Sequence, residues 1–586
     1  MLRTATVLLL APLASAAPQW SKDPALDLVL SDGAGSEVQP KLARAADGRV
    51  LASWYDSDPS GSPAFGFDVR LQSLDPAGQP QWASGGVLVA DRGYSSTQDY
   101  GLDVGPDGAA FLAFRDDRFT GDQITAARYD ASGNASWGPN GVQLTNTSAF
   151  VAAPKIAATS DGQCVVAWSE NNVVRAQRLD AAGAPLWGAG LTLPAPAGGA
   201  VVLSDLVSDG AGGAVIAWVR QPSGFLGPKH LWVQRLDVNG NSVWAPAGVP
   251  LFEGDSLQFG NFPSLVPDGV GGVLCAWYGT GPLQCYAQRV LPNGSLAWQA
   301  DGLPLSLDAS QIRVSPSLAY DAASDTATCA WTELNGLQSM RGISAQRLDA
   351  AGNRLWGPNG VSVVPLGSDD VGFARAVAVE AGSALLWFQS PGFGQDVVRA
   401  AHLDASGASL HAIASIASTP SSKDDLVAVR GPLGDALCAW HGDAGGDDDV
   451  RAKNVRADGG VGQQAGALFR NAGTNAATYT VDVGGLGGAL VATVDLSSST
   501  HPLALLFAYL APSALPFGSQ EILVDLLDPA GEILGLPPAL GPSAQFSVPI
   551  PNNSALCGLL LATQAVHAGG PDPLELTNAQ DVYLGL

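Results

Sequence analysis

The sequence predicts an all-β protein: an eight-bladed β-propeller closed by an N-terminal strand, followed by a small β-sandwich-like C-terminal domain. Only 14% of the 586 residues are charged, while 46% are hydrophobic and 71 are glycines. This composition is typical of short strands joined by tight turns. A unit of four alternating runs recurs along most of the chain, and four strands per repeat are typical of a propeller blade. The last unit lacks one run, which stands instead near the N-terminus.

Each repeat has the same four runs of alternating apolar and polar residues. In the clearest copy, the first run (Pro154–Thr159) leads through an Asp-Gly turn to a second run that ends at Trp168. A third run ends in Arg-Leu-Asp at 178–180, and a fourth begins at Trp187 after another glycine turn. Asp-Gly between alternating runs predicts a β-hairpin, because glycine adopts positive φ at little cost. Each repeat is therefore expected to form a four-stranded antiparallel sheet.

The number of repeats can be counted from two recurring aromatic positions. The aromatic residue that closes the second run occurs eight times, at Trp54, Phe114, Trp168, Trp218, Trp277, Trp331, Trp387 and Trp440. The tryptophan that opens the fourth run occurs at Trp82, Trp137, Trp187, Trp244, Trp298 and Trp356. We assign Leu410 to this place in the seventh repeat. The eighth repeat has no such residue, but Trp20 and the run 26–30 supply one from the other end of the chain. An N-terminal strand should thus complete the last blade and leave no open edge.

The chain is expected to divide into three parts. Residues 1–17 have a basic start, an apolar run and small residues at the end, the layout of a secretory signal peptide. Residues 18–462 hold the repeats, and residues 463–586, which contain no tryptophan, should form the C-terminal β-domain. No later apolar run reaches the roughly 18 residues that a membrane helix needs. We therefore expect a protein without a membrane span that is secreted or held in the cell envelope, in the periplasm or outside the cell.

Charge and cysteine content narrow the class of partner. The 29 Lys and Arg residues against 54 Asp and Glu give a net charge of −25, so the surface should repel nucleic acids and anionic membranes. Six cysteines are too few for a disulfide scaffold, and we expect Cys275, Cys329 and Cys438, which share one place in the repeat, to lie in the core. The sequence leaves open a cross-strand disulfide between Cys275 and Cys285. We expect a monomer that binds a protein or a polysaccharide and no nucleic acid.

Two parts of the chain, the repeats and the C-terminal segment, resemble known families. The repeat, with DGAGGAVIAW (209–218) and AQRLDAAGNRLWGPNGV (345–361), resembles the uncharacterised propeller repeats of secreted bacterial proteins over about residues 18–460. It is more loosely similar to the tryptophan-docking repeats of eight-bladed quinoprotein dehydrogenases. RNAGTN (470–475), VPIPNNSALCGLLLATQA (548–565) and LTNAQDVYLG (576–585) resemble the C-terminal β-domain of exported planctomycete-type bacterial proteins. These resemblances imply an architecture and an accessory domain of unknown role.

Binding residues are expected on the loops that vary between repeats. The connections from the first to the second run and from the third to the fourth are short and uniform, whereas the other two differ in length and content. Variable loops on a rigid scaffold are a common place for binding. The candidate binding residues in these loops are Tyr55, Asp56, Arg115, Asp116, Asp117, Arg118, Arg220, Tyr278, His441, Asp443 and Asp447.

The sequence names no catalytic residue and suggests no cofactor except calcium. The loop 442–449 contains four carboxylates, whose oxygens calcium prefers, although the spacing is not that of an EF-hand. The usual serine-hydrolase, zinc-protease and P-loop motifs are absent, and so is the adjacent cysteine pair that the quinoprotein resemblance implies. The sequence therefore favours a secreted, non-catalytic propeller that binds a protein or a polysaccharide. The alternatives are a polysaccharide hydrolase or lyase that uses carboxylates in the central channel, and a passive structural protein of the envelope.

Overall fold

The computed structural model describes residues 20–57, 66–93, 99–193, 198–380, 382–444, 446–534 and 536–586. The predicted signal peptide lies outside the described residues. These residues form strands β1 to β42 and one short 3₁₀ turn, η1 (Ser554–Leu556), so the all-β prediction is confirmed. In this part of the chain, no helix is long and apolar enough to cross a membrane.

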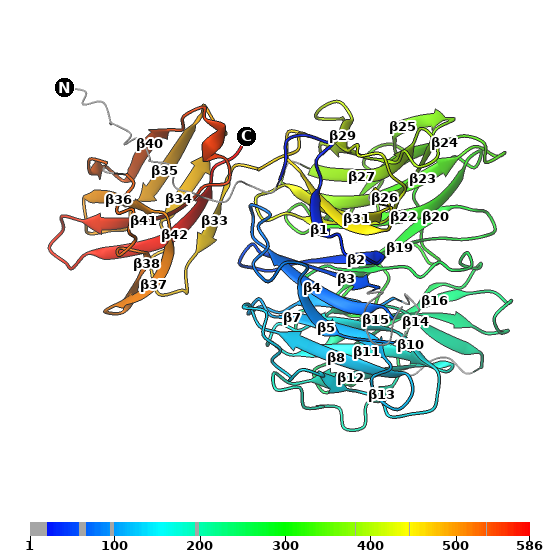
Figure 1. Cartoon of the computed structure of the whole chain (residues 1–586). Helices are drawn as coiled ribbons and strands as arrows, with labels where there is room; N and C mark the ends of the chain where they lie inside the picture. Colours follow the sequence, from blue (N-terminus) through cyan, green and yellow to red (C-terminus); the bar gives the residue numbers. More distant parts are fainter. Residues whose placement is uncertain are drawn as a thin grey trace.

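The described residues up to Val455 form eight four-stranded sheets that follow one another around a ring (Figure 1). The first four sheets are β2 (Glu37–Arg44), β3 (Val50–Asp56), β4 (Asp68–Leu74) and β5 (Val87–Ala90); β6 (Gly101–Val104), β7 (Ala110–Asp116), β8 (Gln123–Tyr129) and β9 (Val142–Gln143); β10 (Val151–Ala158), β11 (Cys164–Glu170), β12 (Val173–Leu179) and β13 (Leu191–Thr192); β14 (Ala200–Ser208), β15 (Ala214–Gln221), β16 (His230–Leu236) and β17 (Val249–Phe252). The others are β18 (Leu265–Pro267), β19 (Val273–Tyr278), β20 (Cys285–Val290) and β21 (Leu303–Pro304); β22 (Ile312–Asp321), β23 (Thr326–Leu334), β24 (Arg341–Asp349) and β25 (Val361–Gly367); β26 (Asp370–Val379), β27 (Gly382–Ser390), β28 (Val397–Leu403) and β29 (Ala414–Ala417); β30 (Lys423–Arg430), β31 (Ala436–Gly442), β32 (Asp449–Val455) and, from the N-terminus, β1 (Leu28–Ser31).

Strands from the two ends of the propeller close the ring. The first strand of each sheet contacts the first strand of the next, from β2 through β6, β10, β14, β18, β22, β26 and β30 back to β2. β1 pairs antiparallel with β32, with Leu28 opposite Ala452. The last sheet therefore takes its outer strand from the N-terminus, which is the closure that the sequence predicts.

In every sheet except the seventh, the tryptophan at the start of the fourth run contacts the next sheet. Trp298 Nε1 donates to the carbonyl oxygen of Ala350, 3.1 Å away in the following sheet. Its ring covers a turn glycine of that sheet, because a Cβ at Gly352 would lie only 2.7 Å from it. At the closure Trp20 repeats the contact, with Nε1 donating to the carbonyl oxygen of Pro76 at 3.1 Å. The recurring tryptophans are thus the links between blades, as their position in the repeat suggests.

In the seventh sheet His411 takes the place of this tryptophan, so our assignment of Leu410 is wrong by one position. The His411 ring packs directly against the turn glycine Gly459, whereas Leu410 is exposed. The imidazole is held by a 2.7 Å hydrogen bond between its Nε2 and Nδ1 of His402. A flat polar ring fills a site for which we expected an apolar side chain.

Gly352→Ala should destabilise the propeller more than Gly357→Ala. Both glycines have positive φ, 83° and 81°, so alanine is strained at each by about 1 kcal/mol. A Cβ at position 352 would also meet the Trp298 ring, whereas one at position 357 would find no atom within 4 Å. We expect an additional cost of about 1–3 kcal/mol for Gly352→Ala, measured as the difference in free energy of unfolding in urea. Equal costs would show that the tryptophan contact is not tight.

All six cysteines are free thiols in the structure. Cys275 lies opposite Gln288, and Cys285 lies opposite Tyr278, so the two cysteines are not cross-strand neighbours. The disulfide that the sequence left open is therefore not formed. Its absence follows from the register of the β19–β20 hairpin, which the spacing about the turn does not reveal.

We expect five of the thiols to react with Ellman's reagent only after the protein unfolds. They are buried, and burial raises the pKa of the Cys438 thiol, for example, to about 12. The reactive thiolate is thus scarce and out of reach. Cys557, which is partly exposed, should be the one thiol that reacts in the native protein. Titration of native and denatured samples gives the two counts, and two or more fast native thiols would contradict the burial.

The C-terminal segment forms two sheets that share one core and a third sheet of two strands. The five-stranded sheet has the order β33 (Gly466–Arg470), β42 (Glu575–Tyr583), β41 (Leu560–Ala568), β36 (Leu503–Tyr509) and β39 (Ala539–Leu540). The three-stranded sheet has the order β34 (Tyr479–Val483), β35 (Ala489–Asp495) and β40 (Ser543–Pro549), and β37 (Pro512–Phe517) pairs with β38 (Gln520–Val524). Leu490 and Phe546 of the smaller sheet pack with Leu506 and Leu561 of the larger one. The predicted boundary at residue 462 falls in the connection between β32 and β33.

Candidate functional site

The two ends of the propeller sheets carry different connections. The turn face carries the short turns between first and second and between third and fourth strands. The variable-loop face carries the other connections: the described parts of 32–36, 57–67, 91–100, 117–122, 144–150, 171–172, 193–199, 222–229, 253–264, 279–284, 305–311, 335–340, 368–369, 391–396, 418–422 and 443–448.

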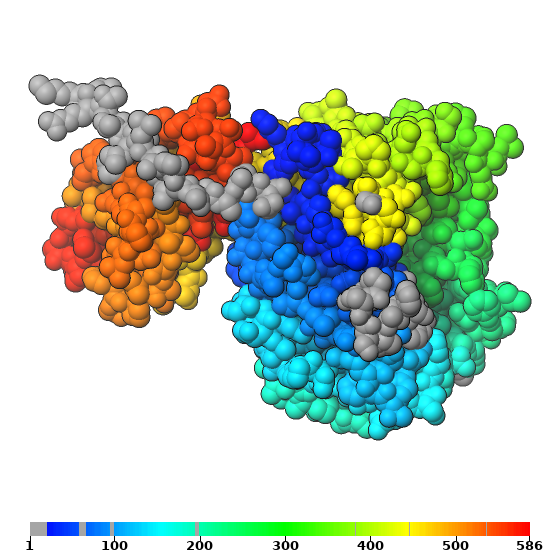
Figure 2. Space-filling view, in the orientation of Figure 1, coloured from blue at the N-terminus to red at the C-terminus, as the bar shows by residue number. Residues whose placement is uncertain are grey.

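The C-terminal sheets contact the turn face. The side-chain amide of Gln463 donates to the carbonyl oxygen of Pro76 at 3.4 Å, and Leu468 packs directly against Gly48. Both partners lie in turns of the first propeller sheet. Figure 2 shows the C-terminal segment, in orange and red, beside the blue part of the propeller. A partner of the propeller would therefore find the C-terminal domain at the end opposite to the variable loops.

The variable-loop face carries the exposed phenylalanines of the propeller. They come from five different loops or strand ends, and among the described residues before β33 no other phenylalanine is exposed: Phe150, Phe225, Phe259, Phe262, Phe373 and Phe393. Phe225 and Phe259 meet edge to face with ring centroids 5.1 Å apart, and the Lys229 ammonium lies 5.3 Å from the Phe259 centroid. Large apolar side chains that gather on one exposed face are typical of an interaction site.

The sequence analysis missed these phenylalanines, although a signal for them exists. Several stand next to glycines in loops, as in Ser-Gly-Phe-Leu-Gly at 223–227 and Pro-Gly-Phe-Gly at 391–394. An aromatic residue flanked by glycines has little local chain to cover it. Most of the residues predicted from the sequence are charged instead, because catalysis and metal binding need charged groups.

Tyr55 and Asp56 contact other residues of the propeller more than they contact solvent. Tyr55 is buried, with its ring centroid 4.6 Å from that of Tyr100 and the Arg92 guanidinium 4.5 Å above it. Asp56 binds the Arg70 guanidinium at 2.9 Å. Their partners come from another strand or another sheet, so the sequence could not show that these side chains are engaged.

The four charged residues Arg115, Asp116, Asp117 and Arg118 are also engaged within the protein. Arg115 forms an ion pair with Asp122. Arg118 donates two hydrogen bonds, of 2.9 and 2.8 Å, to the carboxylate of Asp116. Asp117 accepts a hydrogen bond from a backbone N–H at 3.0 Å. They order the loop 117–122.

Of the other candidate residues, Arg220 and His441 lie near carboxylates and Tyr278 is partly exposed. Arg220 lies 3.7 Å from Glu253, and His441 Nδ1 lies 3.6 Å from the carboxylate of Asp425. Tyr278 ends strand β19 on the variable-loop face, and burial raises the pKa of its phenol. All three side chains are partly exposed, so a partner could reach part of each.

The predicted calcium loop is partly committed to other contacts. Asp443 is exposed and accepts a hydrogen bond from the Ser422 N–H at 2.6 Å, and Asp449 binds Arg451 at 2.6 Å. Asp447 is partly exposed. In the part of the chain that the structure describes, no three His, Cys, Asp or Glu side chains form a group that could hold a metal ion. Calcium binding at this loop stays a prediction, to be checked by calorimetry.

A charged group lies at the inner strands, toward the variable-loop end. Asp99 binds Lys41 at 2.7 Å and also binds Lys155. Burial opposes ionisation of Asp99, but the two ammonium groups outweigh it and hold its pKa well below the usual range. Burial raises the pKa of Asp205 despite the nearby Lys155, and its carboxylate accepts a hydrogen bond from the Leu265 N–H at 2.7 Å. Two carboxylates with oppositely shifted pKa values thus flank one lysine.

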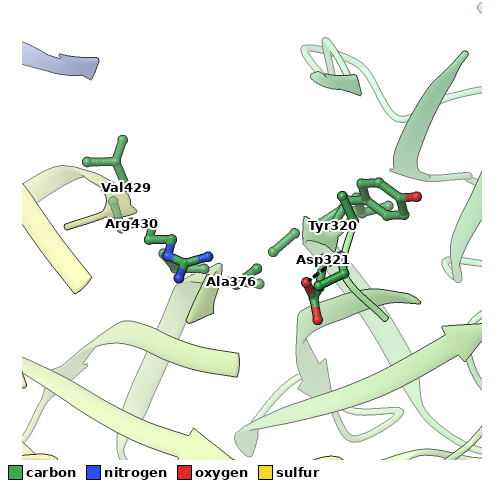
Figure 3. Close-up of a pocket in the computed structure, with 12 residues that line it drawn as sticks. Tyr320, Asp321, Ala376, Val429 and Arg430 are labelled. Carbon is green, nitrogen blue, oxygen red and sulfur yellow. Dashed lines mark hydrogen bonds between the residues drawn. The ribbon is translucent and has the colours of Figure 1, made fainter. Parts of the chain in front are cut away.

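A cavity of about 480 Å³ lies nearer the turn face, between the first strands β22, β26 and β30. It is lined by residues 318–323, 376–378 and 428–430, of which most are alanine, leucine or valine. Figure 3 shows Arg430 and Asp321 on opposite sides of the cavity, with Ala376 between them. So few polar side chains offer little with which to orient a substrate.

No known protein family matches the sequence, and no curated protein does. Among solved structures, the chain is similar to a protein of unknown function from Dyadobacter fermentans, with 10% identity, coverage of 73% of this chain and 96% of that chain, and a TM-score of 0.34. It is also similar to the Dos1 propeller (11% identity, 72% and 93% coverage, TM-score 0.37) and to an exo-β-1,3-galactanase from Phanerochaete chrysosporium (15%, 67% and 97%, 0.24). At these TM-scores the likenesses say nothing about activity, and the family resemblances of the repeat and the C-terminal domain stay predictions.

Proposed function

We propose that this protein is a secreted, non-catalytic propeller that binds a protein or a polysaccharide through its variable-loop face. The observation that carries the proposal is the position of the six exposed phenylalanines, all on that face. Exposing large aromatic side chains to water is unfavourable, so their gathering at one end of the ring is best explained by a partner that covers them. The charged loop residues hold the loops in place, because most of them are paired within the protein.

Removing the paired rings should weaken binding of the natural partner by more than about tenfold. The variant is Phe225→Ala/Phe259→Ala in the full chain, tested against a panel of purified polysaccharides and proteins of the cell envelope by surface plasmon resonance. Val270→Ala is the matched control, because Val270 is similarly exposed but lies on the turn face. Unchanged binding by the double variant, or an equal loss in the control, would contradict the proposal.

A polysaccharide hydrolase or lyase is the second candidate, and Asp99 and Asp205 are the observation that favours it. Enzymes that cleave glycosides use one ionised and one protonated carboxyl group, and these two carboxylates have pKa values shifted in opposite directions. Release of reducing sugar from a polysaccharide by the purified chain, abolished by Asp205→Asn, would establish this activity. If the protein had only a passive structural role in the envelope, neither Phe225→Ala/Phe259→Ala nor Asp205→Asn would change the binding of any polysaccharide or protein in the panel.

A further inference from the structure

We propose that a pocket spanning sheets five to seven of the variable-loop face holds an apolar side chain from a basic segment of a partner protein. This inference rests on the proposed function and narrows it, because it chooses a protein over a polysaccharide. The pocket has a volume of about 260 Å³. That is below the about 300–1,000 Å³ of pockets that enclose a whole small ligand, so its size fits a protruding side chain.

The walls of the pocket are mostly apolar and come from four segments. Leu283 belongs to the loop 279–284, Ile312 and Val314 begin β22, and Leu334 ends β23. The polar side chains that line it include Ser315, Thr332, Gln338 and Arg341. An apolar side chain gains directly from the apolar walls, and of the four polar side chains Arg341 is already bound to Asp370 at 2.6 Å. The lining therefore favours a protein segment.

Phe373 stands at the rim of this pocket, and the backbone holds it there. It has φ of 57° at a bulge where β26 shifts its register against β27. The same bulge recurs in other sheets with residues that are polar or small, such as Gln39, Ala153 and Asp425. In the seventh sheet it presents a phenylalanine, 52% exposed, to the solvent. Leu337 of the neighbouring loop is 88% exposed, so the pocket has apolar side chains around it that a partner can cover.

The charge around the pocket indicates a basic partner. Asp308, Asp369 and Asp370 lie in or beside the loops that surround it, and each is at least partly exposed. Against them stands the exposed guanidinium of Arg341, which binds Asp370 at 2.6 Å. Arg313 is buried, binds Glu333 at 2.8 Å and lies 3.7 Å from Asp308, so Asp369 and Asp370 contribute most of the exposed negative charge. The exposed charges thus sum to a negative rim, which is complementary to Lys or Arg residues beside the inserted side chain.

The test is selection of a random 12-residue phage-displayed peptide library on the immobilised full chain, followed by synthesis of enriched peptides. We expect these peptides to carry a Leu, Ile, Phe or Trp flanked by Lys or Arg. Phe373→Ala should weaken their binding more than about tenfold, and Asp369→Lys should weaken it by a smaller factor that shrinks at high salt. Val270→Ala is the control, since Val270 is exposed but lies on the turn face, away from the pocket, and it should change affinity less than about twofold.

The outcomes separate this inference from the proposed function. Enriched peptides that lose affinity in the Phe225→Ala/Phe259→Ala variant but not in Phe373→Ala would overturn the pocket and leave the binding face intact. Polysaccharide binding at the variable loops with no enriched peptide would overturn the choice of a protein partner. No ligand of either class on this face would overturn both.

Discussion

Trp20→Ala should lower the free energy of unfolding of the propeller by about 3–5 kcal/mol, the usual cost of deleting a large buried aromatic side chain. Trp20 is 3% exposed and belongs to a core cluster with Leu28, Leu437 and Val450. It also makes the closing contact, because its Nε1 donates to the carbonyl oxygen of Pro76. The loss falls beside the last sheet, in which β1 from the N-terminal end of the chain pairs with β32 from the other end of the propeller.

The measurement is urea unfolding followed by tryptophan fluorescence. All 15 tryptophans lie before residue 463, so this signal reports the propeller and not the C-terminal sheets. Leu26→Ala is the matched control, because Leu26 lies in the same N-terminal segment but is 60% exposed. We expect its effect to stay within about 0.5 kcal/mol. If Trp20→Ala were as mild as the control, the propeller would hold together without its closing strand.

The fold could be predicted from the sequence because each repeat carries recognisable residues from which the number of sheets can be counted. The spaced Trp and Asp-Gly positions mark each sheet, and the displaced Trp20 marks the closure. The prediction failed in the seventh repeat, where His411 replaces the tryptophan. The apolar Leu410 beside it is the more obvious match to an apolar position, so it was assigned instead. The partner that fixes the imidazole, His402, lies on β28 across a turn, and such pairing is not visible in a single repeat.

The candidate site could be predicted only as a face. Variation among the loops predicts a binding end of the ring, but it does not show which side chains are exposed there. Tyr55 lies under Arg92 from the connection that follows the first sheet, and Arg115 binds Asp122 across a hairpin. Charged loop residues find such partners readily, whereas phenylalanines in short glycine-flanked loops do not. An apolar residue in a short glycine-flanked loop is therefore a better sequence signal for an exposed binding residue than a charged residue is.

The propeller should lose stability as the pH rises from about 5 to 9, and Glu37 should account for a large part of the loss. Glu37 is fully buried, and its Oε1 accepts a hydrogen bond from the Gly33 N–H at 3.0 Å. Among the described residues its Oε2 has no hydrogen-bond partner. Burial, followed by the charges of Asp56 and Asp449, raises the pKa of Glu37 to about 8.

The direction follows from which state binds the proton. The unfolded chain releases it near pH 4.5, the ordinary value for a glutamate, while the folded protein retains it up to about pH 8. Between these values the folded state binds more protons, so its stability is fully present below pH 4.5 and declines until the folded group ionises. A shift of this size corresponds to about 2–4 kcal/mol once some relaxation around the ionised carboxylate is allowed for.

Glu37→Gln should flatten this decline, because glutamine keeps the shape of the neutral acid and cannot ionise. At pH 9 we expect the variant to be more stable than the wild type, and at pH 5 nearly equal to it, in unfolding curves followed by tryptophan fluorescence. Glu380→Gln is the control, since it makes the same chemical change at an exposed turn position and should leave the pH dependence intact. A wild-type profile that is flat from pH 5 to 9, or one that Glu37→Gln leaves unchanged, would mean that the ring closure tolerates an ionised carboxylate at this seam. The neighbouring Asp56 and Asp449 would then have to be neutralised by Arg70 and Arg451 more completely than the ion pairs at 2.9 and 2.6 Å imply.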